Sequence, residues 1–250
     1  KRSELNGAET DFGVAGNATL TFGENSEVLL NNHIADLRSD IRFYGYGAII
    51  NQGKIIADGT NGNKSRYIYP DSFTNEGTVE AANGAELFIS STNRSNEDVI
   101  SASDSILNLN GTWTNESSAT VDAVNSTVRF IGNWDNNGIL NLTDSRLDLE
   151  GSFATEDIGV INRSGDTSTY IEGLLDNTDD TLVLDATTGS YILNGSIIQG
   201  GIITQSDGAV LEFTSSTNNR LDGAVLQGDL VLTDSYDYAR FYYGASFTGD

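Results

Sequence analysis

The sequence predicts an all-β protein, built as a parallel β-solenoid of about ten coils of roughly 20 residues each. Three observations lead to this fold class. The chain is rich in Gly, Asn, Asp, Ser and Thr, its hydrophobic residues still make up 38%, and one short phrase returns at a nearly constant interval. A disordered chain lacks so much apolar content, and a fixed repeat of this length is typical of solenoids.

The repeated phrase reads apolar-x-Asn-x-Gly-x-β-branched, and each copy predicts one short strand beside a turn. Its copies are, in chain order, residues 49–55, 73–79, 113–119, 134–140 and 175–181, with fainter ones around Asn96 and Thr155. The anchor positions are therefore 51, 75, 96, 115, 136, 155 and 177, and we expect Gly200 and Gly228 to continue the series. Because the steps from 51 to 177 stay between 19 and 24 residues, the same chemical role returns at the same place on each coil.

A second strand follows in each unit, after a polar turn. It is supplied by alternating apolar and polar residues at 84–89, 104–109, 125–131, 144–149, 189–193 and 208–213. Such alternation makes one strand face apolar, and a single unit cannot bury that face alone. Units stacked about 4.8 Å apart bury it in a continuous core. We therefore expect one domain over residues 1–250, as a segment of a longer chain or filament, with a protruding loop at 58–71 around the only Pro.

Two columns of equivalent side chains are expected to run along the rod. Asn tolerates the left-handed backbone of a tight turn, and stacked Asn side chains can bond as a ladder. We expect this structural turn ladder from Asn51, Asn75, Asn96, Asn115, Asn136 and Asn177. Large apolar groups at one phase usually face the core, which predicts a stacked apolar column of Phe73, Trp113, Trp134, Phe153 and Leu175. Turned outward, the same column would form a strip able to hold sugar rings.

Charge and composition disfavour several classes of partner. The formal net charge is −23, from 36 acidic and 13 basic residues, and this repels nucleic acid and anionic membrane surfaces. The chain has no Cys, so neither a disulfide framework nor a thiolate metal site is expected. No run approaches the roughly 18 apolar residues of a membrane span. We expect no nucleic-acid partner and no membrane insertion.

The sequence offers no specific catalytic or cofactor-binding residue. The single histidine, His33, lies beside two asparagines at an expected turn, which favours a surface role over that of a general base. Carboxylates are abundant, and the candidate acids of a polysaccharide-cleaving site are Asp176, Asp179 and Asp180, or Asp144 and Asp148. A solvated acidic face is the simpler interpretation. Calcium is the one cofactor left open, because Asp, Asn and turn carbonyls are hard ligands, although no EF-hand or nonapeptide calcium pattern occurs.

Two stretches resemble a known family. NGSIIQGGIITQSDGAVLEF (194–213) and NRLDGAVLQGDLVLTDS (219–235) look like coils of large bacterial surface proteins of the filamentous-haemagglutinin and autotransporter-adhesin type. The resemblance is one of pattern and covers roughly residues 16–250. It implies a right-handed parallel β-helix, an extracellular or cell-surface location, and a role in attachment, matrix building or filament formation, with no shared active site.

Three functions are compatible with this fold. The first is a non-catalytic extracellular structural protein, an adhesin, stalk or filament subunit, because the open ends of a solenoid carry unpaired backbone groups that end-to-end self-association would satisfy. Its partners would be further copies, glycans, or the surface of a host or neighbouring cell. The alternative is a polysaccharide-binding or polysaccharide-cleaving β-helix, which predicts outward aromatics among Trp113, Trp134, Tyr170 and Tyr191 beside clustered acids. A phage tail-spike-like fibre segment, the third, predicts a trimer.

Overall fold

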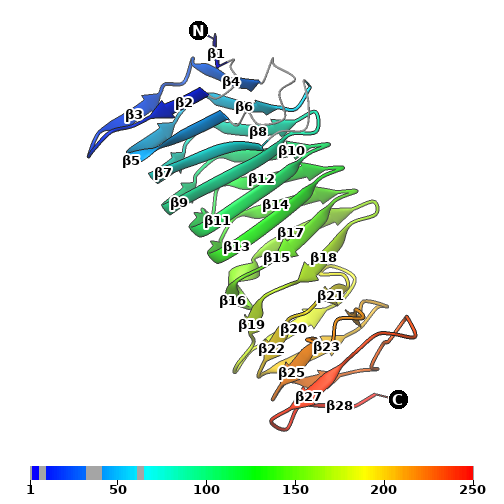
Figure 1. The fold of residues 1–250 in the computed structure, drawn as a ribbon. Coiled ribbons are helices and arrows are strands. Elements are labelled where there is room, and N and C mark those ends of the chain that lie inside the picture. Colours follow the sequence, from blue (N-terminus) through cyan, green and yellow to red (C-terminus); the bar gives the residue numbers. More distant parts are fainter. Residues whose placement is uncertain (1, 6–9, 32–40, 61–64, 250) are drawn as a thin grey trace.

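The structure, a computed structural model, is a rod of stacked parallel strands (Figure 1). It describes residues 2–5, 10–31, 41–60 and 65–249. About 60% of the chain is strand, wound into about nine turns, close to the ten expected. The parallel β-solenoid predicted from the repeat is confirmed. Among the described residues, the single 3₁₀ turn η1 (Glu156–Ile158) is the helical element, and no helix there has the length and apolar content to span a membrane.

Sheets A and B run from the amino-terminal end (Figure 1). Sheet A has eight strands, in chain order: β1 (Arg2–Leu5), β4 (Glu27–Asn31), β6 (Lys54–Asp58), β8 (Thr78–Ala82), β10 (Val99–Ser103), β12 (Thr120–Val124), β14 (Ile139–Thr143) and β17 (Val160–Ser164). Sheet B has eleven: β2 (Thr10–Gly13), β5 (Ile41–Asn51), β7 (Ser65–Asn75), β9 (Glu86–Asn96), β11 (Ile106–Asn115), β13 (Thr127–Asn136), β15 (Arg146–Leu149), β18 (Ser168–Ile171), β21 (Tyr191–Leu193) and β24 (Leu211–Phe213), with β3 (Thr19–Phe22) also paired to β5.

Two shorter sheets form the carboxy-terminal part. Sheet C contains β16 (Ser152–Ala154), β19 (Leu174–Asp176), β22 (Ile197–Gln199), β25 (Arg220–Asp222) and β27 (Arg240–Tyr242). Sheet D contains β20 (Thr181–Leu184), β23 (Ile202–Gln205), β26 (Val225–Gln227) and β28 (Ser246–Phe247). The pairings in all four sheets are parallel, and each joins a strand to the equivalent strand of the next coil.

The core follows from the alternation in the sequence. In β8, β10 and β12 every second side chain is buried, so the chain places one apolar residue on the next. Val79, Ile100 and Val121 stack in this way in sheet A, and Leu87, Leu107 and Val128 in sheet B. Full burial of such a side chain contributes about 1.5–3 kcal/mol, which no isolated coil could obtain.

The long strands of sheet B divide in the middle of the rod. β13 runs without a break for 10 residues, whereas its neighbour β15 ends at Leu149 and β16 begins at Ser152. From this coil onward sheet C is separate, and sheet D replaces sheet A after β17. Glu150 and Gly151 lie between β15 and β16, at the division.

Two details differ from the expectation. The loop predicted at 58–71 is wrong for its second half, because residues 65–71 belong to β7; residues 61–64 lie outside the described residues. Pro70 lies where the register of β7 against β9 is interrupted, between Ile68 and Ser72, and such irregularities are the places where strands accept proline. Near the carboxy-terminal end, Gln199 pairs with Asp222, which places Gly223, and not Gly228, one coil after Gly200.

Candidate functional site

Five of the six expected asparagines form one hydrogen-bonded ladder inside the rod. They lie in register on successive coils and are at most 2% exposed. The Nδ2 group of each donates to Oδ1 of the next, over 2.8, 2.7, 2.8 and 2.7 Å from Asn51 through Asn75, Asn96 and Asn115 to Asn136. The ladder therefore holds the same turn of five consecutive coils.

The asparagine-to-asparagine hydrogen bonds of the ladder end where η1 is inserted. Asn136 donates to the carbonyl oxygen of Ile158 over 2.8 Å instead of to another asparagine. Thr155 takes the next anchor position, and its hydroxyl donates to Asn177 Oδ1 over 2.7 Å. Asn177 in turn donates to the Ile202 carbonyl over 2.9 Å. The sixth expected asparagine thus occupies the anchor position, but with threonine and backbone partners.

The apolar column points inward. Its members are at most 4% exposed: Phe73, Trp113, Trp134, Phe153 and Leu175. Trp113 and Trp134 are register partners, and the rings of Trp134 and Phe153 stack with centroids 4.5 Å apart and planes at 30°. Tyr191 is buried as well. These aromatics belong to the core, so the column does not form an outward strip for sugar rings.

An arginine occupies one place in this column, a feature that the sequence analysis missed. The pairing of β7 with β9 sets Arg94 against Phe73, and that of β9 with β11 sets it against Trp113. Arg94 is only 8% exposed. The repeat itself carries the signal, because Arg94 stands two residues before Asn96, as Phe73 and Trp113 stand two residues before their own asparagines.

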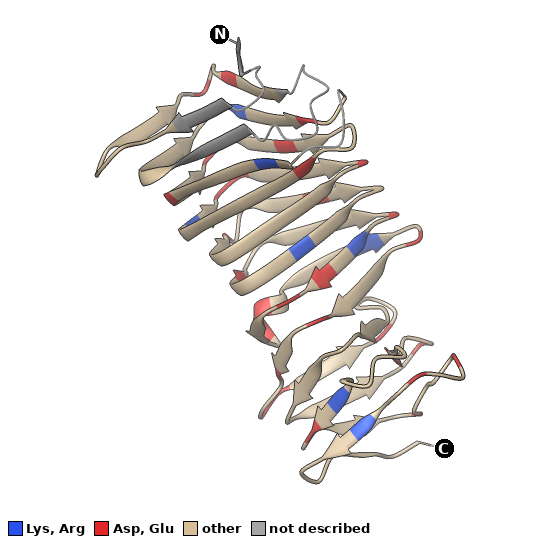
Figure 2. Ribbon diagram, in the orientation of Figure 1, with Lys and Arg blue, Asp and Glu red and all other residues tan. Residues whose placement is uncertain are grey.

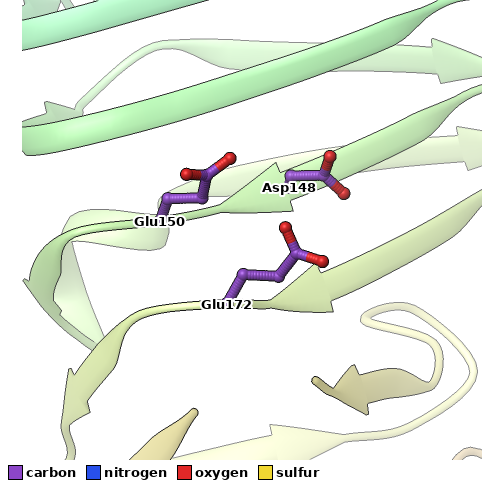
Figure 3. A group of neighbouring side chains, drawn as sticks. All are labelled: Asp148, Glu150 and Glu172. Atoms are coloured by element: carbon purple, nitrogen blue, oxygen red, sulfur yellow. The ribbon is translucent and has the colours of Figure 1, made fainter. Parts of the chain in front are cut away.

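A carboxylate cluster lies where sheet B divides (Figure 3). Asp148 is on β15, Glu150 directly follows β15, and Glu172 follows β18 on the next coil. Each offers an oxygen atom, and these atoms lie within 4.8 Å of one another. Asp148 is buried and the two glutamates are partly buried. Acidic residues elsewhere occur along the whole rod (Figure 2), so this convergence, and not acidity as such, distinguishes the cluster.

Two arginines neutralise most of the cluster. Arg129 Nε lies 3.2 Å from one oxygen of Asp148, and Arg146 Nε binds the other oxygen. Arg146 Nη2 also lies 2.9 Å from Glu172 Oε1, and its guanidinium group stands 3.8 Å from the ring centroid of Tyr170. These contacts join β13, β15 and β18, three successive strands of sheet B. The cluster therefore acts as an electrostatic cross-link between coils.

The ionisation of the cluster follows from its surroundings. Burial, together with the negative charges of Glu172 and Asp148, raises the pKa of Glu150. Burial opposes the charge of Arg146, but the hydrogen bond and charge of Asp148 and the charge of Glu172 raise its pKa overall. Carboxylates are suitable calcium ligands, yet two of these three already have arginine partners, which a cation would have to displace.

The other acidic candidates lie at strand ends and in turns, outside this cluster. Asp144 and Asp179 have positive φ angles, of 48° and 60°. Asp144 accepts a bond from the backbone N–H of Asp166 over 2.8 Å, and Asp180 from that of Thr181 over 2.7 Å. Bonds from the Thr178 hydroxyl and backbone lower the pKa of Asp176. Asp176 and Asp180 thus bond within their own turn, whereas Asp144 links its turn to the next coil. Of the expected acids only Asp148 joins the cluster, and His33 lies outside the described residues.

An aromatic groove lies on the outer side of sheet B. It has a volume of about 720 Å³ and is lined by Tyr67, Tyr69, Pro70, Ser90 and Asn110, among others. The ring of Tyr67 is parallel to that of Phe88, 4.9 Å away at 12°, and Tyr69 meets Tyr67 edge-on at 6.1 Å. The sequence analysis did not identify this groove, although Tyr67 and Tyr69 are separated by one residue, the spacing that puts two side chains on one strand face.

Comparison of the chain with protein-family models, with curated proteins and with solved structures finds no match. The class of the protein therefore rests on its geometry. It is a parallel β-solenoid with an internal asparagine ladder, an arginine–carboxylate cross-link and an aromatic groove beside Tyr67 and Tyr69.

Proposed function

We propose that the protein is a non-catalytic extracellular rod, a cell-surface adhesin or stalk or a filament subunit built by coil stacking. The observation that carries the proposal is the coil-to-coil register, which continues through the described residues from β5 to β28. Such stacking yields length and stiffness, the properties that a stalk or filament requires. The carboxylate cluster supports a structural role, because arginines hold Asp148 and Glu172 in ion pairs between coils.

The last described coil supports end-to-end association with a further copy. Among the described residues β27 and β28 are the edge strands of sheets C and D, and an edge that no further coil covers attracts another strand of matching spacing. Tyr243 is 86% exposed and Phe247 43% exposed on the same coil, so apolar area is available beside the edge. Contact of this edge with the opposite end of another copy is heterologous and does not close, which produces filaments.

Electron microscopy and light scattering over a range of protein concentrations test the proposal. We expect threads one rod wide whose length grows with concentration. Tyr243→Lys should shorten them, because a charge beside an edge strand opposes pairing. Val124→Lys changes an exposed apolar residue of β12, in the middle of sheet A, and should not. Isolated rods at every concentration would refute self-assembly, and release of reducing sugar from polysaccharides would refute the non-catalytic assignment.

The aromatic groove favours glycan binding as a second candidate function. Tyr67 and Tyr69 offer apolar ring faces and edges. Ser90 and Asn110, whose Nδ2 donates to Ser90 Oγ over 3.0 Å, form a polar pair along the same groove. Asn110 Oδ1 is buried and has no hydrogen-bond partner among the described residues. Polar groups beside aromatic surfaces suit a pyranose ring. The net charge of −23 favours an uncharged glycan over a polyanionic one.

Titration of the protein with neutral oligosaccharides, followed by calorimetry, tests this second function. Tyr69→Ala should weaken binding about tenfold or more, as expected for the loss of one stacking contact. Tyr238→Ala, which removes an exposed tyrosine near the carboxy-terminal end, is the control and should bind as the unaltered protein does. Equal affinities for the two variants would exclude the groove as the binding site.

A further inference from the structure

Arg94 places a positive charge inside the rod without a counter-charge. One guanidinium nitrogen, Nη1, donates to the carbonyl oxygen of Ile89. The other two, Nε and Nη2, are buried and have no hydrogen-bond partner among the described residues. Burial lowers the pKa of Arg94 to about 9, and no charged group contributes to this shift. The side chain therefore remains protonated at neutral pH, in an environment where an unpaired charge is strongly unfavourable.

A small cavity adjoins this charge. It has a volume of about 10 Å³, and its wall includes Phe73, Arg94, Leu109 and Trp113. The indole Nε1 of Trp113 is also buried without a partner among the described residues. In the next coil the equivalent Trp134 Nε1 donates to the Glu150 carbonyl over 2.9 Å. Two side chains of the cavity wall thus carry three donor nitrogens without a partner among the described residues, and one of those side chains is a cation.

The size and polarity of the cavity restrict its occupant. A volume of about 10–15 Å³ accommodates one atom-sized particle, which excludes sulfate, phosphate and carboxylates. A water molecule would bring two hydrogens of its own to a site of unused donors, and it would leave the charge of Arg94 uncompensated. A monatomic anion accepts several N–H groups at once and supplies the missing negative charge.

We propose that the cavity between Phe73, Arg94 and Trp113 is a binding site for one halide ion, and that chloride occupies it in solution. The ion completes the stacked apolar column at the only place where the described column contains a charged residue. Binding is independent of the proposed extracellular function and of the aromatic groove. Since the ion binds only the folded coil, chloride stabilises the rod by mass action.

Thermal unfolding of the full chain tests the site. At constant ionic strength, replacing sodium gluconate by sodium chloride should raise the unfolding midpoint by at least about 2 °C, with saturation as the site fills. Arg94→Met removes the charge and keeps an apolar side chain of similar length, so the chloride response should disappear. Arg240→Met removes an exposed arginine of β27 and should keep the full response.

Bromide supplies a second measurement on the unaltered protein. Crystals grown or soaked in bromide should give one anomalous-scattering peak beside Arg94 and Trp113, whether or not the Arg94→Met variant folds. Equal unfolding midpoints in chloride and gluconate, or a bromide map without a peak in this cavity, would overturn the proposal. A chloride response that persists undiminished in folded Arg94→Met would also overturn it.

Discussion

The same polar residue has different consequences according to its place on the coil. Asn96 donates to Asn115 over 2.8 Å inside the rod, where it is 2% exposed. Asn162 donates to Asn141 over an equal 2.8 Å on the exposed surface. In the first case every lost partner leaves a buried polar group without water, and in the second water replaces the partner at once. We therefore expect burial, and not the hydrogen bond alone, to determine the contribution to stability.

Alanine substitution at the two positions measures this difference. Asn96→Ala removes the acceptor of Asn75 and the donor of Asn115, both buried, and should lower the free energy of unfolding by about 2–4 kcal/mol. Asn162→Ala should lower it by no more than about 0.5 kcal/mol. Urea-induced unfolding of both variants gives the comparison. Similar losses for the two would mean that the ladder adds nothing beyond an ordinary surface bond.

The carboxylate cluster makes a prediction about pH. The folded-state pKa of Glu150 is raised above its ordinary value of 4.5, so the folded protein binds this proton more tightly than the unfolded chain does. The resulting stabilisation is complete below pH 4.5 and is lost as the pH rises through the folded-state value. At pH 7 the charged carboxylate is therefore unfavourable in the folded protein, and Glu150→Gln should unfold at a higher midpoint than the unaltered protein.

The difference in unfolding midpoint between Glu150→Gln and the unaltered protein should narrow as the pH falls from 7 to 4, because Glu150 of the unaltered protein becomes protonated over this range. Midpoints of thermal unfolding at several pH values give the curve. Glu97→Gln removes an exposed carboxylate from an earlier coil and controls for the change in net charge. A gap that widens on acidification would show that the charge of Glu150 stabilises the fold.

At the scale of elements, glycines at one phase of the successive coils from β11 to β16 set how closely the corners of sheet B approach. Gly111 and Gly132 are register partners within long strands, and Gly151 follows at the division between β15 and β16. A Cβ atom on Gly151 would lie 2.1 Å from the carbonyl oxygen of Gly132, and the φ angle of Gly151 is +88°. Backbone contact this close tolerates only glycine.

Gly151→Ala should lower the free energy of unfolding by about 2–5 kcal/mol, from the steric overlap and the strained φ angle together. Gly84→Ala separates the two causes, because Gly84 has a similar φ angle of +79° but no atom within 4 Å of an added Cβ. Gly84→Ala should lower the free energy of unfolding only by the cost of the positive φ angle, about 1–2 kcal/mol. Chemical unfolding of both variants measures the two losses in free energy of unfolding. Equal losses for Gly151→Ala and Gly84→Ala would show that the close backbone contact at Gly151 contributes nothing.

The sequence predicts the recurrence of elements better than their grouping into sheets. The anchors from Asn51 to Asn136 lie in register as their spacing indicates, because a parallel stack repeats one coil. The division of sheet B has no such signal, since Gly151 occupies the same phase as Gly111 and Gly132, where the strands continue. The juxtaposition of Glu150 and Glu172 follows from the same spacing, because these residues are 22 residues apart, which is also the step from anchor 155 to anchor 177. The abundance of carboxylates along the chain is what prevented the sequence from distinguishing this pair.

For the whole molecule, the register makes each coil a nearly independent unit. Strands of each sheet pair only with the strands of the preceding and following coils, so the free energy of folding is close to a sum of coil and interface contributions. The Asn75 and Asn96 anchors are one coil apart, at a distance of 21 residues. Removing residues 76–96 therefore brings the chain back to the same phase, with Asn75 directly above Asn115 and Phe73 above Trp113.

This deletion should give a folded rod about 4.8 Å shorter, with the circular-dichroism spectrum of the intact protein and a cooperative unfolding transition. It also removes Arg94, so the apolar column becomes continuous and the chloride response should vanish with it. Removal of only residues 76–85 shifts the following strands by half a coil, turns their apolar faces out of register and should prevent folding. Small-angle scattering measures the length of each product. A register that repeats by whole coils must survive the loss of one coil. If the deletion of residues 76–96 prevented folding as the deletion of residues 76–85 does, the coils would therefore not be independent units.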